Sequence, residues 1–416
     1  MNREMLASSN QGSTGEADLP RRPTVEDAIA RRRTDLPLLC FRPDAAQRRA
    51  EDFARKFPGK ALYAIKAQAE PTILKAIAAG LRAAGKPVAF DTASLPEIQL
   101  ARSIAPDAQC FFMNPMKKKS WIKAAYELGV RHFVVDHPLE FQKFIELNIQ
   151  RDAAILVRMA TPPGVGLGKA RAAYDLSEKF GAPRDIVLEL LRSVSGAGYP
   201  TGIAFHVGSQ FPATNPWLRC LDVALKLREE SGVNYRYIDV GGGFPGVYAG
   251  MDAGAMQEVI DDVCRHISAL KLAGVEFLAE PGRSIVFDSL SVVNEIIGRK
   301  DRTRMGHRAR SKPSLYIDDG VWSLLAESLT ADFKWPVRWF KDTGPSPRLI
   351  EYYIGGVTCD STDVLAGEYL LPDTLGVGDL IEFGSLGAYS TATTSHFNGF
   401  GEHERVIVAE PFKPSR

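Results

Sequence analysis

Residues 235–244, Tyr-Arg-Tyr-Ile-Asp-Val-Gly-Gly-Gly-Phe, join an apolar run to three consecutive glycines. The run at 235–240 predicts a buried strand, and the glycines predict a tight turn whose backbone N–H groups can converge on an anion. Helical periodicity precedes this stretch at 217–230 and follows it at 255–272. A strand between two amphipathic helices is the repeating unit of a parallel sheet.

The same unit recurs over most of the chain. Further strands are expected at 61–65, 88–90, 110–113, 132–135, 154–158, 202–206 and 277–279, and further helices at 71–84, 95–104, 120–128, 139–149 and 184–195. Eight such units are typical of a (β/α)8 barrel, although a doubly wound sheet can be drawn from the same pattern. After residue 283 the helical periodicity fades, and short strands are expected at 291–297, 314–317, 348–355, 379–383 and 404–408. We therefore expect an N-terminal arm over 1–37, a barrel over 38–283 and a β-rich domain over 284–416.

Charge and cysteine usage exclude several classes of protein. The 416 residues include 51 Lys and Arg against 50 Asp and Glu, and a net charge of +1 argues against nucleic-acid binding. Five isolated cysteines without a C-x-x-C pair favour reduced thiols over a disulfide framework or a zinc site, and we expect no metal. The chain has no signal-peptide core and no run of about 18 apolar residues, so we expect a cytoplasmic protein that does not enter a membrane.

Three local features complete this picture. Residues 1–22 are polar and predict a disordered or loosely attached arm. Thr24 predicts the N-cap of a short helix that ends at Ala30, because Glu26 and Asp27 would lie near its positive end. The run 117–119, Lys-Lys-Lys, predicts a solvated loop or the start of a helix.

Side chains with useful chemistry follow three of the expected strands, where barrels place their active sites. Lys66 follows the first strand; partial burial and a neighbouring cation would lower its pKa and make it a nucleophile, whereas a snorkelling lysine is the simpler alternative. His206 and Ser209 could contact a planar ligand and a phosphate, or be a core histidine and a turn serine. Glu280 and Arg283 could bind a cationic ring nitrogen and a phosphate, or form an ion pair that fixes the loop.

Taken together, these residues and the glycine turn supply an amine, an aromatic ring, an anion site and a carboxylate at one face of the barrel. Those are the parts that hold pyridoxal phosphate.

At this point the chain resembles the fold-type III pyridoxal-phosphate decarboxylases, the ornithine/diaminopimelate/arginine decarboxylase group, and within it the ornithine decarboxylases. The resemblance implies an α/β fold with an alanine-racemase-like (β/α)8 barrel and a second β-rich domain. It covers about residues 38–410. The matching segments are 63–66, 90–94 with Glu97, 206–210, 241–246, 280–283, 359–361 with Asp363, 387–389 and 397–400.

The resemblance also implies roles for individual residues. Lys66 would bond to the cofactor's aldehyde, His206 would stack on its ring, Glu280 would bind the pyridine nitrogen, and Cys359 would protonate the product carbon. Cofactor binding would further involve Asp91, Arg158, Ser209, Gly242, Gly243, Arg283 and Tyr389, and substrate binding would involve Asp360, Asp332 and Phe397. The family is homodimeric, so Cys359 and Asp360 would complete the partner subunit's site.

The implied reaction is decarboxylation of a basic L-amino acid to an amine and CO2, a lyase step of the kind used in polyamine biosynthesis. Ornithine is the default substrate, with lysine or a related diamino acid as alternatives. Two departures bear on the substrate: Asp332 falls one position late for a second carboxylate facing the distal amine, and Gln68 stands where Asn is usual. A non-catalytic antizyme-inhibitor-like protein, a racemase and a diaminopimelate decarboxylase remain open, although the last usually has Cys-Glu at 359–360.

Overall fold

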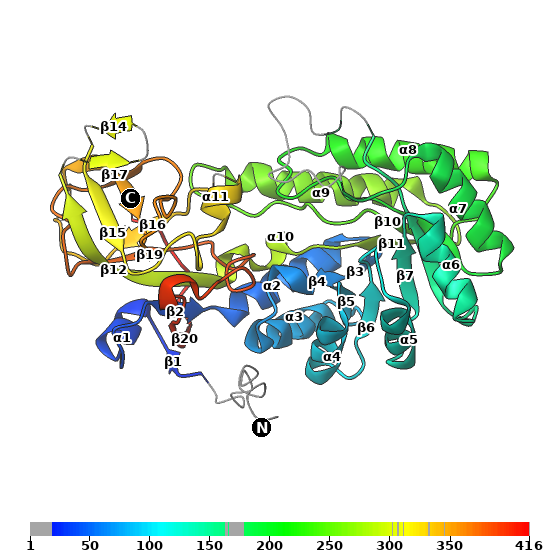
Figure 1. Cartoon of the computed structure of the whole chain (residues 1–416), viewed down its shortest axis with the longest axis horizontal. Coiled ribbons are helices and arrows are strands. Elements are labelled where there is room, and N and C mark those ends of the chain that lie inside the picture. Colours follow the sequence, from blue (N-terminus) through cyan, green and yellow to red (C-terminus); the bar gives the residue numbers. More distant parts are fainter. Residues whose placement is uncertain are drawn as a thin grey trace, which may run out of the picture.

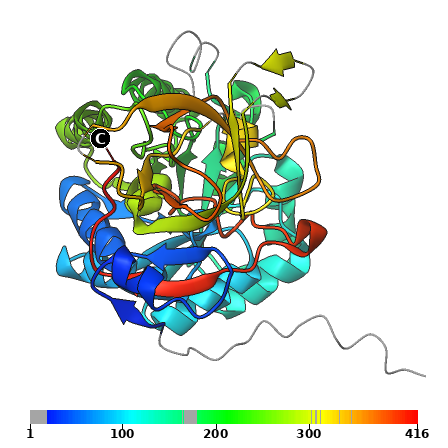
Figure 2. The same cartoon turned by 90° about the vertical axis from the view of Figure 1, so that its left-hand side faces the viewer.

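Two bodies of structure lie end to end in the protein (Figure 1). The computed structural model describes residues 19–162, 165, 179–301, 303–305, 308–310, 312–331, 333–344 and 346–415. The expected disorder of the N-terminal arm falls mainly on residues 1–18, which lie outside the described residues. A parallel barrel with its helices forms the larger body, and a mixed sheet lies in front of it in Figure 2.

Within the described residues, the barrel contains nine short strands that are all parallel to their neighbours. They are β3 (Lys60–Ala61), β4 (Tyr63–Ala64), β5 (Ala89–Thr92), β6 (Gln109–Phe112), β7 (His132–Val135), β8 (Ala154–Arg158), β9 (Thr201–Ala204), β10 (Tyr237–Asp239) and β11 (Glu276–Ala279). Strands β3 and β4 flank Leu62, and they correspond to one expected strand. Because β3 pairs with β11 and β4 pairs with β5, this broken strand closes the ring. The expected eight-unit barrel is confirmed.

Helices connect the barrel strands and surround them. They are α2 (Pro43–Lys56), α3 (Pro71–Ala83), α4 (Leu95–Ile104), α5 (Lys119–Glu127), α6 (Pro138–Glu146), α7 (Arg184–Gly196), α8 (Asn215–Ser231) and α9 (Ala253–Leu270). Proline occupies the first turn of several of them, where its missing N–H leaves no bond unmade. Among the residues described, no helix is both long and apolar enough to cross a membrane.

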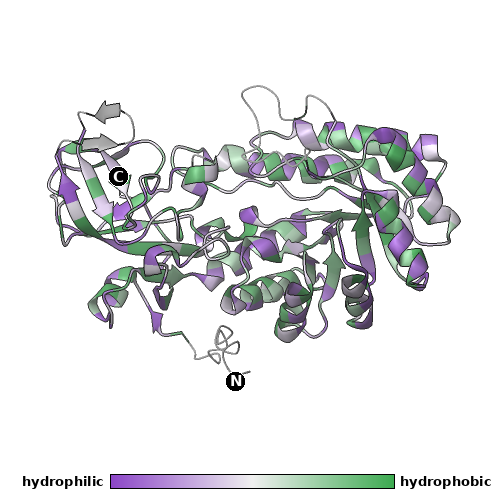
Figure 3. Cartoon of the chain, viewed as in Figure 1, coloured by the Kyte–Doolittle hydropathy of each residue, from purple (hydrophilic) through white to green (hydrophobic). Residues whose placement is uncertain are grey.

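The core has two layers around the barrel strands. Leu62, Phe111, Leu156 and Leu278 pack inside the ring, and a larger apolar cluster fills the space between the strands and the helices. The strands are accordingly hydrophobic along most of their length, whereas the helices carry both polar and apolar residues (Figure 3).

In the part of the chain that the structure describes, a nine-stranded sheet forms the second body. Its strands are β1 (Arg21–Arg22), β2 (Leu38–Phe41), β12 (Leu290–Lys300), β15 (Ser314–Ile317), β16 (Val337–Trp339), β17 (Leu349–Gly355), β18 (Tyr369–Pro372), β19 (Leu380–Phe383) and β20 (Glu404–Val408). Strand β2 pairs with β12 and β20, so this segment of the expected barrel region adds to the second sheet. A hairpin of β13 (Thr303–Met305) and β14 (Arg308–Arg310) follows β12.

Other helical segments are shorter. They are α1 (Val25–Ala30), α10 (Arg283–Val286) and α11 (Glu327–Ala331), with 3-10 turns η1 (Ile65–Ala67), η2 (Phe287–Ser289) and η3 (Phe397–Gly399). The expected cap of α1 is confirmed, since the side chain of Thr24 accepts a hydrogen bond from the Asp27 N–H at 3.1 Å.

The lysine run at 117–119 is only partly as expected. Helix α5 does begin at Lys119, but Lys117 is 2% exposed, so the prediction of a solvated side chain is wrong for it. Its Nζ donates to the carbonyl oxygens of Asn114, Pro115 and Val134 at 2.6, 2.9 and 2.6 Å. Asn114 and Pro115 follow β6, whereas Val134 lies within β7. Burial lowers the pKa of Lys117 to about 7.

Candidate active site

Lys66 lies at the carboxyl end of the first barrel strand, in the turn η1. Its Nζ donates to Asp91 Oδ2 at 3.0 Å, and the register that pairs Ala64 with Asp91 brings the two side chains together. Asp91 is buried, whereas the Lys66 side chain is 43% exposed. Burial lowers the pKa of Lys66, but the carboxylates of Asp91 and Glu280 outweigh it, and the net direction is upward. The expected lowering is therefore wrong, because carboxylates face the amine.

Two more buried carboxylates lie at the ends of neighbouring strands. Asp239 ends β10, and Glu280 follows β11; they are 0% and 9% exposed. Burial, followed by the charges of Asp239 and Asp91, holds the pKa of Glu280 well above its usual range. Burial also raises the pKa of Asp239 to about 7, although the Gly241 N–H donates to its Oδ1 at 2.8 Å. The sequence assigned Asp239 no role; its only signal is an acidic residue within an apolar strand.

His206 lies beside the glycine turn with its ring neutral. Burial, then Arg158 and Lys66, hold the pKa of His206 well below its usual range. The Gly208 N–H donates to its Nδ1 at 3.0 Å, so the ring proton is assigned to Nε2. A Cβ on Gly242 would lie 3.0 Å from that Nε2, which places the imidazole against the turn. Arg158 ends β8.

The glycine turn accepts no side chain. Gly241 and Gly243 have φ of +67° and +96°. A Cβ on Gly243 would lie 2.3 Å from the Gly208 oxygen, and one on Gly242 would lie 2.7 Å from the Glu280 oxygen. The turn therefore presents bare backbone to the barrel mouth.

Arg283 begins α10 and is buried. Its Nη1 and Nη2 donate to Glu327 of α11 at 2.7 and 2.5 Å, and Nη1 also donates to the Tyr248 hydroxyl at 2.5 Å. The alternative in which Arg283 pairs with Glu280 is wrong, since Glu327 takes that place. Nη2 lies 3.4 Å from Ser209 Oγ. Glu327 and Tyr248 were not singled out by the sequence.

The second body reaches this site through Tyr389. The Tyr389 N–H donates to the Ala67 oxygen at 2.8 Å, and its ring centroid lies 4.9 Å from the Arg283 guanidinium. Gln68 reinforces the junction: its Nε2 donates to the Gly387 oxygen at 3.2 Å, and its Oε1 accepts from Thr391 at 2.9 Å. Gln68 is fully buried. The glutamine that stands where Asn is usual therefore joins the barrel to the second body through these hydrogen bonds.

These residues fit pyridoxal phosphate. The buried Nε of Arg283 has no hydrogen-bond partner among the residues described, and it belongs to the side chain whose Nη2 faces Ser209. The glycine turn is a cradle that a Cβ would fill. Glu280 and Lys66 supply a carboxylate for a ring nitrogen and an amine for an aldehyde. The described residues contain no cluster of three or more side chains arranged to hold a metal ion.

The remaining expected site residues form a second group. Cys359 is exposed, and its Sγ and N–H both donate to Asn398 Oδ1 at 3.2 Å. Asp360 accepts from the Thr362 N–H at 2.8 Å and from its hydroxyl at 2.9 Å, which lowers the pKa of that carboxyl. No hydrogen bond or ion pair found in the described part of the chain joins this group to Lys66. Asp332 lies outside the described residues.

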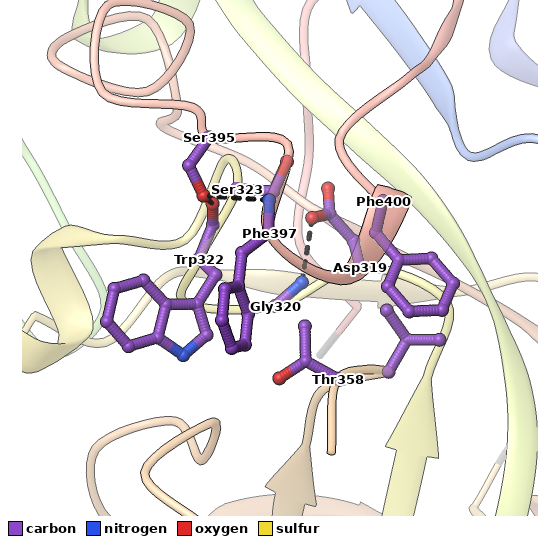
Figure 4. Close-up of a pocket in the computed structure, with 9 residues that line it drawn as sticks. Asp319, Gly320, Trp322, Ser323, Thr358, Ser395, Phe397 and Phe400 are labelled. Atoms are coloured by element: carbon purple, nitrogen blue, oxygen red, sulfur yellow. Dashed lines mark hydrogen bonds between the residues drawn. The ribbon is translucent and has the colours of Figure 1, made fainter. Parts of the chain in front are cut away.

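A small apolar pocket adjoins this second group (Figure 4). The rings of Trp322 and Phe397 face each other in it with centroids 5.2 Å apart. Val357, Thr358 and Phe400 also line it, next to Cys359 in the chain or on the same loop as Asn398. Phe397 is 40% exposed. The sequence did not indicate Trp322.

Comparisons with known proteins find similar sequences and similar structures. Residues 44–287 match the family described as pyridoxal-dependent decarboxylase, pyridoxal binding domain. The chain is 30% identical to a lysine/ornithine decarboxylase of Selenomonas ruminantium over 89% of this chain and 88% of that one, and 30% identical to an antizyme inhibitor 2 of Xenopus laevis over 82% and 74%. It is similar to the structure of a lysine/ornithine decarboxylase from Vibrio vulnificus complexed with putrescine, with a TM-score of 0.74, 28% identity, and coverage of 93% and 98% of the two chains.

Proposed function

The chain belongs to the pyridoxal-dependent decarboxylases, and from this premise we propose that it decarboxylates an L-amino acid with a terminal amine to the diamine and CO2. The family places it among pyridoxal-phosphate lyases that act on basic amino acids. Ornithine is the default substrate and lysine the next. The observation that carries this choice is Asp360, a partly exposed carboxylate beside Cys359 that is suited to a distal ammonium group.

The residues of the barrel mouth divide the work of holding and activating the substrate. When bound, pyridoxal phosphate supplies a ring that accepts the electron pair left by departing CO2. Glu280 would hold a proton on the ring nitrogen, and the neutral His206 imidazole would stack on the ring without adding a positive charge. Asp91 orients the Lys66 amine through the 3.0 Å hydrogen bond that it accepts from Nζ. The same carboxylate favours the protonated form of the amine until the amine reacts.

The phosphate would lie among the glycine turn, Ser209, Arg283 and Tyr389. Ser209, the glycine turn and Arg283 follow three different barrel strands, β9, β10 and β11, which supports a rigid anchor. The Cys359 thiol would return a proton to the substrate carbon after CO2 leaves. Its hydrogen bond to Asn398 would fix the position of the sulfur atom.

We propose that each active site is completed across a homodimer. The exposure of Cys359, the partial exposure of Asp360 and their separation from the Lys66 group support this arrangement. Mixing Lys66→Ala with Cys359→Ala chains would test it. With random exchange, a 1:1 mixture of the two variants, each impaired in amine formation on its own, should recover about a quarter of the native amine formation, because half of the dimers carry one intact site of two. A mixture whose amine formation does not recover despite exchange would refute shared sites.

CO2 release from a panel of L- and D-diamino acids of varied length would test the substrate. Five- and six-carbon basic L-amino acids should react best, and glutamate and leucine should not react. Asp360→Asn should raise KM for the diamino acids. Asp342→Asn is the matched control, since Asp342 also caps an exposed turn, through the Gly344 N–H. A protein that stays colourless with added cofactor and releases no CO2 from any substrate would instead support the antizyme-inhibitor-like alternative.

A further inference from the structure

Arg283 is held by more partners than phosphate binding alone requires. The Glu327 carboxylate accepts hydrogen bonds from Nη1 and Nη2 at 2.7 and 2.5 Å, and the Tyr248 hydroxyl accepts a second hydrogen bond from Nη1 at 2.5 Å. The guanidinium carbon also lies 4.9 Å from the ring centroids of both Phe333 and Tyr389. The ion pair is almost wholly buried, with side-chain exposures of 2% for Arg283 and 7% for Glu327. The guanidinium therefore has one orientation.

That orientation leaves a specific pair of donors unused. A guanidinium has five N–H donors, and the Nε–H and the outer Nη2–H point to the same side as a fork. Nε is buried without a hydrogen-bond partner among the described residues, and Nη2 is 3.4 Å from Ser209 Oγ. A buried orphan donor is costly unless a ligand satisfies it. The open fork thus faces the side where Ser209 lies.

We propose that Glu327 is a positioning residue that locks Arg283 so that its Nε and Nη2 present a two-donor fork to the phosphate of the cofactor. This inference rests on the proposed placement of that phosphate beside Ser209. The Glu327 carboxylate on the neighbouring Nη1–Nη2 edge fixes the fork because two parallel N–H···O bonds define a plane. Glu327 also balances a charge that burial would otherwise disfavour.

The test compares two ligands of the cofactor-free protein, pyridoxal phosphate and pyridoxal, which lacks the phosphate. The ratio used here is the dissociation constant of pyridoxal divided by that of pyridoxal phosphate. It measures how much the phosphate adds to binding, and it needs no turnover. In Glu327→Gln one of two charge-assisted bonds is lost, so affinity for pyridoxal phosphate should fall by about tenfold or more while affinity for pyridoxal stays within about twofold. Glu327→Asp keeps the charge but shortens the reach; it should lower the ratio as well, and it carries the test if Glu327→Gln does not fold.

Glu382→Gln is the matched control. Glu382 is a fully buried partner of Arg42 and Arg338 in the second sheet, so its loss should lower the melting temperature and leave the ratio unchanged. A parallel fall in both affinities in the Glu327 variants, or no fall in either, would overturn the proposal. Equal native affinity for the two ligands would overturn it too. Failure of the substrate proposal would leave this ratio untouched, because no amino acid enters the measurement.

Discussion

Gly243→Ala tests whether the glycine turn tolerates a side chain. Gly243 has φ +96°, and an added Cβ would lie 2.3 Å from the Gly208 oxygen and 2.8 Å from Val207 Cγ2. Gly232 offers a matched control, because its φ is +69° and its Cβ would meet no atom within 4 Å. Both substitutions force an alanine into left-handed backbone, but only one creates overlap.

The magnitudes separate the two variants. Left-handed backbone costs an L-residue about 1–2 kcal/mol, which both variants incur. Overlap in a packed region adds about 1–3 kcal/mol, which only Gly243→Ala incurs. We therefore expect a total loss of unfolding free energy of about 2–5 kcal/mol for Gly243→Ala and about 1–2 kcal/mol for Gly232→Ala.

Denaturant unfolding and titration with pyridoxal phosphate measure the two effects. Because a backbone shift at Gly243 moves the proposed phosphate cradle, this variant should also bind the cofactor at least about tenfold more weakly, whereas Gly232→Ala should bind it normally. Equal stability and equal affinity of the two variants would refute the reasoning. So would a destabilised Gly243→Ala that binds the cofactor as tightly as the native chain.

Three further outcomes are expected. The pKa of Asp239 is about 7 in the folded chain and about 4 in the unfolded chain, so only the folded chain holds this proton between those pH values. The stability of the cofactor-free protein should therefore fall as pH rises from about 4 to 7. Calorimetry should show that Asp239→Asn raises the melting temperature at about pH 8 and not at about pH 4. Gln68→Asn should lose the hydrogen bond to Gly387, worth about 1 kcal/mol, and should release the cofactor several-fold faster in stopped-flow absorbance. An unchanged release rate would contradict the proposed role of Gln68 in joining the two bodies. Cys359→Ala should still release CO2 but yield less amine per CO2, measured by chromatography, whereas a racemase would not depend on the thiol.

Much of the barrel could be predicted because each unit carries its own local signal. An apolar run bounded by helical periodicity needs no distant partner to be recognised, and α4 and β8 have the expected bounds. Strand β2 had no such signal. Its partners lie more than two hundred residues away, with Leu38 opposite Val293 and Glu404, and long-range pairing leaves no mark in the local sequence.

The site divides in the same way. Lys66, His206, the glycine turn and Glu280 could be grouped beforehand because parallel strands bring their carboxyl ends to one edge. Glu327 could not, since its role depends on Arg283 approaching from another element. The pKa of Lys66 was misjudged for a related reason: its sign depends on which charges face the amine, and only the folded chain brings Asp91 and Glu280 there.

Reductive trapping with borohydride in the presence of pyridoxal phosphate, followed by peptide mapping, tests the central claim most directly. Lys117, whose pKa is lowered to about 7, is the internal competitor, but it is 2% exposed and its Nζ is bonded to three carbonyls. The account predicts one label per chain on Lys66 and none in Lys66→Ala. A label on Lys117 or another lysine, with Lys66 unmodified, would contradict it.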